Sequence, residues 1–210
     1  MVTTALPIAS RRDVEDTKTR ILEALARIVV RDGLAGVGIN ALAREAGADK
    51  VLIYRYFGNL EGVYAAYAER EPFWWRRADL VAGLDPARST LADAVKLCLR
   101  RHAAELRKRP VTLAILAAEP SQRTPLVIAL EQVRERRAIE LSDWIAERYA
   151  LPSGIDLAAV SLVLSAAINY LAARSKTISV MSGVSIDSEN GWERLSAAID
   201  LLVERALADG

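Results

Sequence analysis

Apolar side chains recur at intervals of three and four residues along almost the whole chain, and proline or glycine marks the breaks between these runs. This spacing places the apolar groups on one face of a helix. A half-buried strand would instead alternate apolar and polar residues, and the sequence has no sustained alternation of that kind. The 210-residue chain is therefore expected to be all-α, with about nine helices and no strands.

The expected helices fall into two groups that differ in length. Before about residue 60 they are short and separated by small turn residues, and after it they are long and apolar. This change predicts a small N-terminal module over residues 13–58 and a larger helical domain over residues 59–210. The helices are expected at residues 14–31, 40–46, 50–56, 59–81 with a kink at Pro72, 88–108, 110–119, 125–149, 157–179 and 192–208, with a loop at 179–191.

Residues 40–56 read N-A-L-A-R-E-A-G-A-D-K-V-L-I-Y-R-Y, which predicts two short helices around a tight turn. Ala43 is small where the two helices must approach closely, and Gly47, four residues later, allows the left-handed backbone that the turn needs. Ile53, six residues further on, can seal both helices against the apolar stripe of the first helix. This is the spacing that a helix-turn-helix requires, although many helical hairpins share it. The stripe consists of Ile21, Leu25, Ile28 and Val29.

The second helix of this motif is expected to have a polar outer face. With Ile53 and Phe57 directed inward, the side chains that can point outward are Lys50, Tyr54 and Arg55, with Tyr56 at the helix end. Lysine and arginine neutralise phosphates, tyrosine hydroxyls hydrogen-bond to them, and a helix N-terminus offers them free N–H groups. The alternative is a solvated helical hairpin whose tyrosines complete a small core.

From Thr17 to about Tyr67 the sequence resembles the tetracycline-repressor (TetR) family of transcriptional regulators. The resemblance is carried by Gly33 after the first helix and by the segments T-x-x-x-I-L-x-A-L, A-L-A-R-E-A-G, I-Y-R-Y-F and N-L-E-G-V-Y. The remaining two thirds resemble the family only in their long helices and in a last helix that contains tryptophan. The resemblance implies that double-stranded DNA is bound by the helix-turn-helix, with the candidate residues Asn40, Asp49, Lys50, Val51, Leu52, Tyr54, Arg55 and Tyr56.

The chain departs from the family pattern at several of these positions. Gly38 stands where Thr or Ser usually opens the second helix, so Asn40 is the expected cap. Asp49 replaces a usual serine, and its carboxylate caps a helix well but repels a nearby phosphate. Val51 replaces a glycine and Leu60 a common lysine. These changes predict weaker DNA binding and an atypical operator, and they leave open a derivative that has lost DNA binding.

A helix-turn-helix reader works as a pair, because two recognition helices must lie about 34–36 Å apart, or a multiple of that, along the duplex. In the TetR family the last two helices pair with their copies as a four-helix bundle, which implies a homodimer here. The alternative is that these helices turn their apolar stripes toward the protein's own core. The stripes are Val160, Leu164, Ala167 and Leu171 on one helix and Leu195, Ile199, Leu202 and Ala206 on the other.

The resemblance also implies a small-molecule pocket among the middle helices. Aromatic groups with few polar ones suit an apolar or aromatic effector, although the tryptophans are equally suited to an ordinary core. Cys98 and His102 lie one helical turn apart, but a metal site needs three or four ligands and Glu119 is the only further candidate, so we predict no metal and no cofactor. The candidate ligand-binding residues are Trp74, Trp75, Cys98, His102, Asn169 and Tyr170.

Composition limits the classes of function. A net charge of +1 gives no overall attraction to nucleic acid or to an anionic membrane, so a DNA-binding surface must be a local patch. One cysteine and one histidine provide neither a disulfide framework nor a catalytic triad, and no enzyme is predicted. No signal peptide is recognisable, and the apolar run at residues 157–174 is shorter than a bilayer span and is interpreted as a buried helix. We therefore expect a cytoplasmic protein without membrane contact.

These observations together predict a ligand-responsive transcriptional regulator, specifically a repressor. It would bind a palindromic operator as a homodimer and be released by a small apolar or aromatic effector. The helix expected at 59–81 would transmit effector binding as a pendulum-like rotation, with Pro72 fixing its bend. Activation instead of repression stays open. So does a TetR-like helical dimer that has lost DNA binding and acts as a protein-interaction or ligand-binding module.

Overall fold

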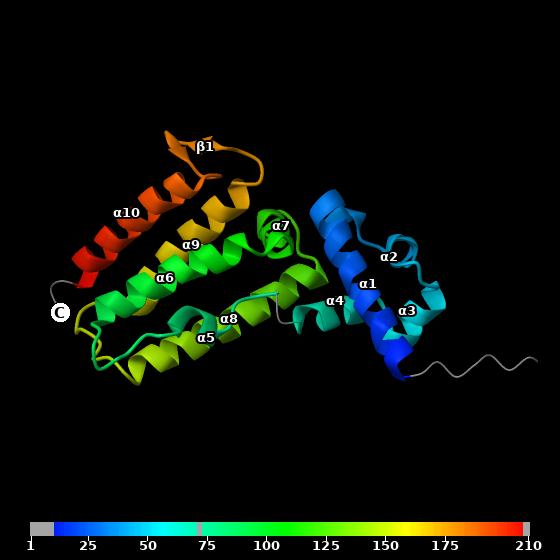
Figure 1. The fold of residues 1–210 in the computed structure, drawn as a ribbon, viewed down its shortest axis with the longest axis horizontal. Coiled ribbons are helices and arrows are strands. Elements are labelled where there is room, and N and C mark those ends of the chain that lie inside the picture. Colours follow the sequence, from blue (N-terminus) through cyan, green and yellow to red (C-terminus); the bar gives the residue numbers. More distant parts are fainter. Residues whose placement is uncertain (1–10, 71–72, 208–210) are drawn as a thin grey trace, which may run out of the picture. The chain divides into compact units, whose positions relative to one another are not determined.

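The structure is a computed structural model that describes residues 11–70 and 73–207. It divides between Arg70 and Glu71 into two compact units (Figure 1). The first unit holds α1 (Arg11–Asp32), the 3-10 helix η1 (Leu34–Gly36), α2 (Ile39–Ala46), α3 (Lys50–Phe57) and α4 (Leu60–Ala68). The second holds α5 (Arg77–Val81), α6 (Leu91–Arg107), α7 (Pro110–Ala118), α8 (Pro125–Ala146), α9 (Leu157–Arg174), the strands β1 (Val180–Met181) and β2 (Val184–Ser185), and α10 (Glu189–Leu207).

The all-α fold class is confirmed, with ten α-helices in the described part of the chain. The two units divide the chain later than the sequence-based boundary after residue 58. The reason is that α4 packs against α1 and α3, and therefore belongs to the first unit.

The first unit is built on α1, which contacts each of the other helices in the unit. The predicted stripe of α1 is buried throughout. Leu42 of α2, Ile53 of α3 and Val63 of α4 are each 0% exposed. Because burying an aliphatic side chain of this size stabilises the fold by roughly 1.5–3 kcal/mol, these contacts hold α3 in one orientation. One face of α3 is thereby committed to the core and the other is left outside.

The turn between α2 and α3 depends on a glycine. Gly47 adopts φ +58° and ψ +39°, a left-handed conformation that a Cβ atom disfavours. The chain leaves α2 with the Ala48 N–H donating to the Ala43 carbonyl at 3.0 Å. α3 then begins at a capped end, because the Asp49 carboxylate accepts a hydrogen bond from the Val51 N–H at 2.8 Å. The predicted glycine turn and the predicted Asp49 cap are both present.

A second glycine lets α4 begin close to the end of α3. The Asn59 side chain caps α4 by accepting from the Gly62 N–H at 2.8 Å. A Cβ atom on Gly62 would lie 1.8 Å from the carbonyl oxygen of Phe57, so only glycine fits this approach. The motif N-L-E-G therefore closes the first unit through a specific backbone contact.

The second unit is organised around α6, which packs against α5, α7, α9 and α10. The buried face of α6 includes Val95, Cys98, Leu99, His102 and Leu106. Its other edge forms ion pairs with α10, and their numbering shows that the two helices are antiparallel. These pairs are Lys96–Glu204, Arg100–Asp200 and Arg107–Glu189.

The prediction of a single kinked helix at residues 59–81 is wrong. α4 ends at Ala68, and Pro72 lies outside the described residues. The segment that follows is drawn into the core of the second unit, where the Thr112 hydroxyl donates to the Phe73 carbonyl at 2.6 Å. α5 starts as a separate helix, because the Arg76 N–H donates to the Asp79 carboxylate in the first turn. Burial of the aromatic residues after Pro72 replaces the expected helical continuation.

The loop expected at residues 179–191 contains a short hairpin, so the absence of strands was also wrongly predicted. β1 and β2 are antiparallel, with Met181 opposite Val184. Ser182 and Gly183 between them have φ values of +49° and +76°, the conformation of a tight two-residue hairpin turn. Two strands of two residues each are too short to produce an alternating pattern that sequence analysis could detect.

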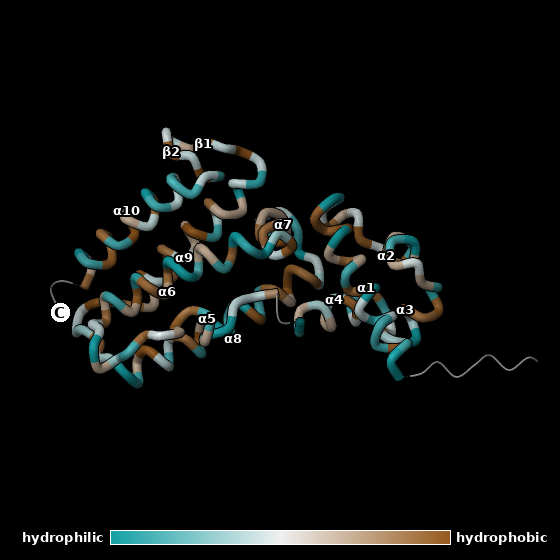
Figure 2. The backbone as a smooth tube through the Cα atoms, viewed as in Figure 1, coloured by the Kyte–Doolittle hydropathy of each residue, from teal (hydrophilic) through white to brown (hydrophobic). Residues whose placement is uncertain are grey.

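Helix α9 is less buried than its sequence predicts. By length and composition alone it could cross a membrane, with a mean hydropathy of 1.6 over 18 residues, yet only 22% of that window is buried in the structure. Leu164 and Ile168 face the core, whereas Leu162 and Val163 are 69% and 67% exposed. The expectation of a buried helix was therefore wrong for the single chain. Figure 2 shows that hydrophobic residues recur along α9.

We expect Gly47→Ala to lower the free energy of unfolding of the first unit by about 1–2 kcal/mol, because alanine is strained in the left-handed region. Gly47→Asn should cost less, since asparagine tolerates that conformation. Urea titration followed by far-UV circular dichroism measures the effect. All four tryptophans lie after residue 70, so the tryptophan fluorescence transition of the second unit serves as an internal control. Equal stability of the alanine variant and the unmodified protein would contradict the role given to this turn.

Candidate functional site

Helix α3 presents a mixed polar and apolar surface outward from the first unit. Lys50, Val51, Tyr54 and Arg55 are exposed, with Val51 67% and Tyr54 52% accessible. Leu52 and Tyr56 are partly buried at the edges of this surface, and Phe57, which was expected to face inward, is also only partly buried. Ile53 alone on α3 is fully enclosed. The structure therefore brings the six predicted α3 residues to one helix, with four of them accessible to a partner.

The two remaining candidates on this surface have different positions. Asp49 is exposed at the N-terminus of α3, and its carboxylate is occupied in capping that helix. Asn40 is not the cap of α2, because Gly38 occupies that position with an extended backbone and Asn40 lies inside the first turn. The capping role predicted for Asn40 is therefore wrong, although its side chain is exposed beside the turn.

The cationic groups of α3 differ in their surroundings from those of α1. Arg27 and Arg31 of α1 both pair with Glu45 of α2, at 2.8 and 3.0 Å. Lys50 and Arg55 form no ion pair with any described residue. Since a phosphate competes best for a cation that is not already neutralised, α3 carries the local positive charge that the near-neutral whole chain lacks.

A cavity of about 420 Å³ lies within the second unit, between α5, α6, α8 and α9. Its inner wall is aromatic and aliphatic, and includes Trp74, Trp75, Leu80, Val95 and Leu99. Five of the six predicted ligand-binding residues line it: Trp74, Trp75, Cys98, His102 and Asn169. A cavity of this size with apolar walls and few polar groups has the character of a small-molecule site.

Tyr170 is the predicted residue that the cavity does not include. It is 57% exposed on the outer face of α9. Its side chain points about 100° around the helix from that of Asn169, and it faces solvent instead of the cavity. The assignment of Tyr170 to the pocket was therefore wrong.

Three side chains along the cavity form a continuous hydrogen-bonded chain. The Trp75 indole Nε1–H donates to His102 Nδ1 at 2.7 Å, and His102 Nε2 lies 2.9 Å from Asn169 Oδ1. Trp74 lies beside these three side chains, with its ring tilted by 51° to that of His102 and the two centroids 5.8 Å apart. Burial lowers the pKa of His102 to about 4, against a smaller opposing effect of Asn169 and with a further lowering by Arg109. The imidazole is therefore neutral at physiological pH.

The geometry disfavours the metal site considered for Cys98, His102 and Glu119. Both ring nitrogens of His102 are occupied by hydrogen bonds. Burial raises the pKa of the Cys98 thiol to about 11, with Arg101 opposing the shift, so the thiolate that a metal would need is disfavoured. Glu119 forms a two-pronged ion pair with Arg134, at 2.9 and 2.7 Å.

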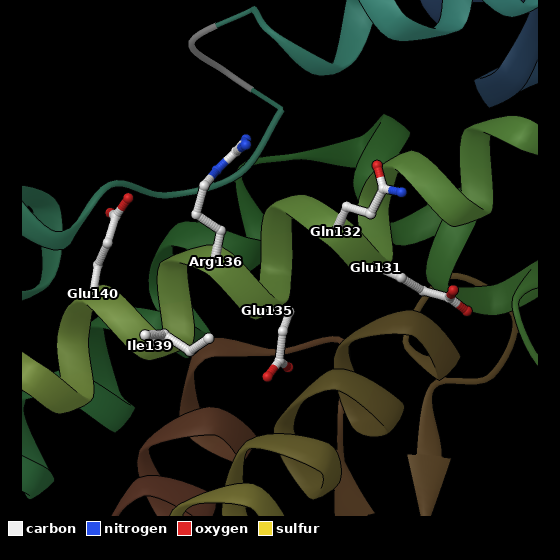
Figure 3. A pocket seen from close by; sticks show the side chains of 6 residues that line it. All are labelled: Glu131, Gln132, Glu135, Arg136, Ile139 and Glu140. Carbon is white, nitrogen blue, oxygen red and sulfur yellow. The ribbon is translucent and has the colours of Figure 1, made fainter.

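An open groove of about 580 Å³ lies along α8 and meets the cavity at Glu135 and Ile139, which line both. Figure 3 shows Glu135 projecting from the side of α8 opposite to Gln132 and Arg136. These lining residues of α8 were missed from the sequence, as were Ser161 and Ser165 of α9. The spacing of 161, 165 and 169 along one face of α9 is the signal that points to the two serines once Asn169 is chosen.

Comparison with known proteins shows sequence similarity over the first unit and a similar fold over both units. The family model described as bacterial regulatory proteins, tetR family, matches residues 21–67. The HTH-type transcriptional repressor SCO4008 of Streptomyces coelicolor is 45% identical over 60 residues, which cover 29% of this chain and 31% of that protein. A TetR-like transcriptional regulator from Rhodococcus sp. RHA1 has a TM-score of 0.63 at 19% identity, covering 97% of this chain and 100% of the other. FadR of Bacillus subtilis, solved in complex with stearoyl-CoA, has a TM-score of 0.61 at 15% identity, covering 88% and 96%.

Two short helices around a glycine turn, packed on a longer first helix, define the first unit as a helix-turn-helix. This helix-turn-helix is similar in sequence to that of the tetR family of bacterial regulatory proteins. The sequence match lies within the first unit, and the chain covers 31% of the length of the curated relatives it matches. The solved structures share the fold of both units at 19% identity or less.

The buried, neutral His102 predicts a specific loss of stability in acid. Unfolded histidine binds a proton below about pH 6.5, whereas the folded group stays neutral down to about pH 4. Its stabilising contribution is complete above pH 6.5 and is lost as the pH falls toward 4, with a slope of at most about 1.4 kcal/mol per pH unit. We expect His102→Asn, which keeps an acceptor near Trp75, to have a shallower slope than the unmodified protein in this window. Urea titrations at several pH values measure it, and identical slopes for the two proteins would refute the assignment.

Proposed function

We propose that this protein is a cytoplasmic transcriptional repressor that binds a palindromic DNA operator as a homodimer and releases it when a small apolar or aromatic effector fills the cavity of the second unit. The observation that carries the proposal is α3, whose exposed face combines unpaired cations with tyrosine beside a helix-turn-helix turn. The name of SCO4008 supports repression as the direction of control.

DNA binding is assigned to α3 and its N-terminal turn. Lys50 and Arg55 supply charges for phosphates, and Tyr54 supplies a hydroxyl. Val51 and Leu52 lie in the first turn of the same helix, where apolar contact with a base edge is possible in the major groove. Asp49 opposes phosphate binding by its charge, so the operator should be bound less tightly than a family pattern with serine would allow.

Dimerisation is assigned to α9 and α10. The outward face of α9 carries Leu162, Val163, Ala166, Ala167 and Tyr170, and that of α10 carries Ala197, Ala198, Leu201 and Leu202. This face agrees only in part with the predicted stripes. Ala167 and Leu202 are exposed as a dimer interface requires, whereas Leu164 is buried within its own unit. An apolar surface of this kind on a protein in water is best explained by a second copy.

The effector response is assigned to the cavity and to the segment that enters it. Trp74 and Trp75 line the cavity and lie shortly after Arg70, where the first unit ends. An effector that fits only one arrangement of these tryptophans biases the segment joining the two units, which takes the place of the pendulum helix expected from the sequence. A coupling of about 1–3 kcal/mol weakens DNA binding roughly 5- to 150-fold.

Lys50→Ala and Tyr54→Ala should each weaken operator binding roughly tenfold while leaving the oligomeric state unchanged. Removing the lysine should also reduce the slope of log affinity against log salt by about 0.9, the value for one neutralised phosphate. The operator comes from selection on random-sequence DNA with the full chain, and fluorescence anisotropy over a salt series gives the affinities.

Lys176→Ala is the matched control, because this exposed lysine follows α9 in the second unit and should leave both affinity and slope unchanged. Dissociation of the oligomer by Lys50→Ala or Tyr54→Ala would contradict the assignment of α3. Failure of the selection at low salt would favour instead a TetR-like dimer without DNA binding, the alternative that Asp49 supports.

Leu162→Arg should convert the dimer to a monomer at micromolar concentration, because it places an unpaired charge at the centre of the proposed apolar interface. Sedimentation equilibrium measures the change. Val30→Arg is the matched control, since Val30 is also 52% exposed but belongs to α1 of the first unit. A dimer that survives the first change and not the second would place the interface elsewhere.

A further inference from the structure

The direction of every hydrogen bond in the Trp75–His102–Asn169 chain is fixed by its first member. An indole N–H can only donate, so His102 Nδ1 must be the unprotonated acceptor. A neutral imidazole carries one proton, which therefore resides on Nε2 and is donated to Asn169. The amide of Asn169 must present its Oδ1 to the imidazole, and the opposite orientation of the amide would leave two donors facing each other.

The Trp75–His102–Asn169 hydrogen bonds engage only the oxygen of the Asn169 amide, so its nitrogen is available to donate to a ligand in the cavity. Asn169 lines the cavity, is only partly buried, and its Nδ2 group has no hydrogen-bond partner among the described residues. The amide cannot rotate to offer its oxygen without breaking the bond to His102. The Asn169 amide nitrogen is thus a hydrogen-bond donor that is held in one orientation toward the cavity.

A second fixed donor lines the cavity, because the Trp74 indole Nε1–H is buried and has no hydrogen-bond partner among the described residues. Two other neighbouring donors are already engaged. The Ser165 hydroxyl, one turn before Asn169, donates to the Leu162 carbonyl at 3.1 Å. The two terminal N–H groups of Arg134 donate hydrogen bonds to the Glu119 carboxylate. Glu135 and Asp143, which also line the cavity, form no ion pair with a described residue. Figure 3 shows Arg136 on the side of α8 opposite to Glu135.

We propose that the effector is an uncharged molecule with an aromatic or aliphatic body and a carbonyl-type oxygen that accepts a hydrogen bond from the Asn169 amide. The body packs on Trp74 and Trp75, and the two unpaired carboxylates at the cavity disfavour an anionic ligand. The proposed effector therefore differs in charge from stearoyl-CoA, the ligand in the solved FadR complex, which carries several phosphates. The proposal rests on the effector role given to the cavity above.

Three probes that share a naphthalene body test the proposal on the full chain: 2-acetylnaphthalene, 2-ethylnaphthalene and 2-naphthoate. We expect the ketone to bind roughly three- to tenfold more tightly than the hydrocarbon, the contribution of one hydrogen bond, and the carboxylate to bind less tightly than the ketone. Affinities and shifts are read from ¹⁵N–¹H correlation spectra. The side-chain amide pair of Asn169, assigned by its absence from the N169D spectrum, should move with the ketone and stay in place with the hydrocarbon.

Asn169→Asp keeps an acceptor for His102 and replaces the donor with a carboxylate oxygen, so it should abolish the preference for the ketone. Ser165→Ala, on the same face of α9, should retain that preference. Equal affinity for ketone and hydrocarbon, a preference that survives N169D, or no binding of any probe up to its solubility limit would each overturn the proposal. Operator binding is measured separately, so a ketone that binds as expected but leaves DNA affinity unchanged refutes the effector role alone.

Discussion

The second unit depends on helix α6, which makes apolar contacts on one face and ion pairs along another edge. One face is apolar and supports the cavity, while an edge of cations is held by the acidic groups of α10. The same helix secures the segment that enters the unit, because Arg101 donates to the carbonyls of Leu80 and Ala82. His102 completes the arrangement by joining Trp75 on one side to Asn169 on the other. The cavity therefore has one wall whose position is set by packing, charge and hydrogen bonding together.

The sequence predicted best where the determining contacts are local. The helix-turn-helix follows from a few short-range requirements, a left-handed residue at Gly47, a cap at Asp49 and a buried aliphatic at Ile53, and all three are found. Predictions failed where a distant part of the chain decides the outcome. The sequence after Pro72 shows no clear end to the preceding helix. Hydrogen bonds of Phe73 with Thr112 of α7 and of Trp75 with His102 of α6 hold these residues outside a helix.

Partial failures on α9 have the same origin. Its composition indicates burial, yet composition does not tell whether the covering surface belongs to the same chain. Asn169 and Tyr170 are adjacent in sequence and equally plausible as cavity residues, but only the rotation of α9 on α6 and α7 decides which of them faces inward. The rotation depends on which residues of three helices meet, and that information is not present in the spacing of any one of them.

The exposed face of α9 also has a consequence for how the protein is made. On the dimerisation proposed above, a monomer leaving the ribosome presents this apolar surface until a second copy covers it, since Leu162 and Val163 are 69% and 67% exposed in the described part of the chain. Assembly then competes with aggregation and with chaperone capture, both of which begin at such surfaces. The amount of functional protein in a cell would accordingly rise more steeply than its rate of synthesis, because folding and pairing draw on the same surface.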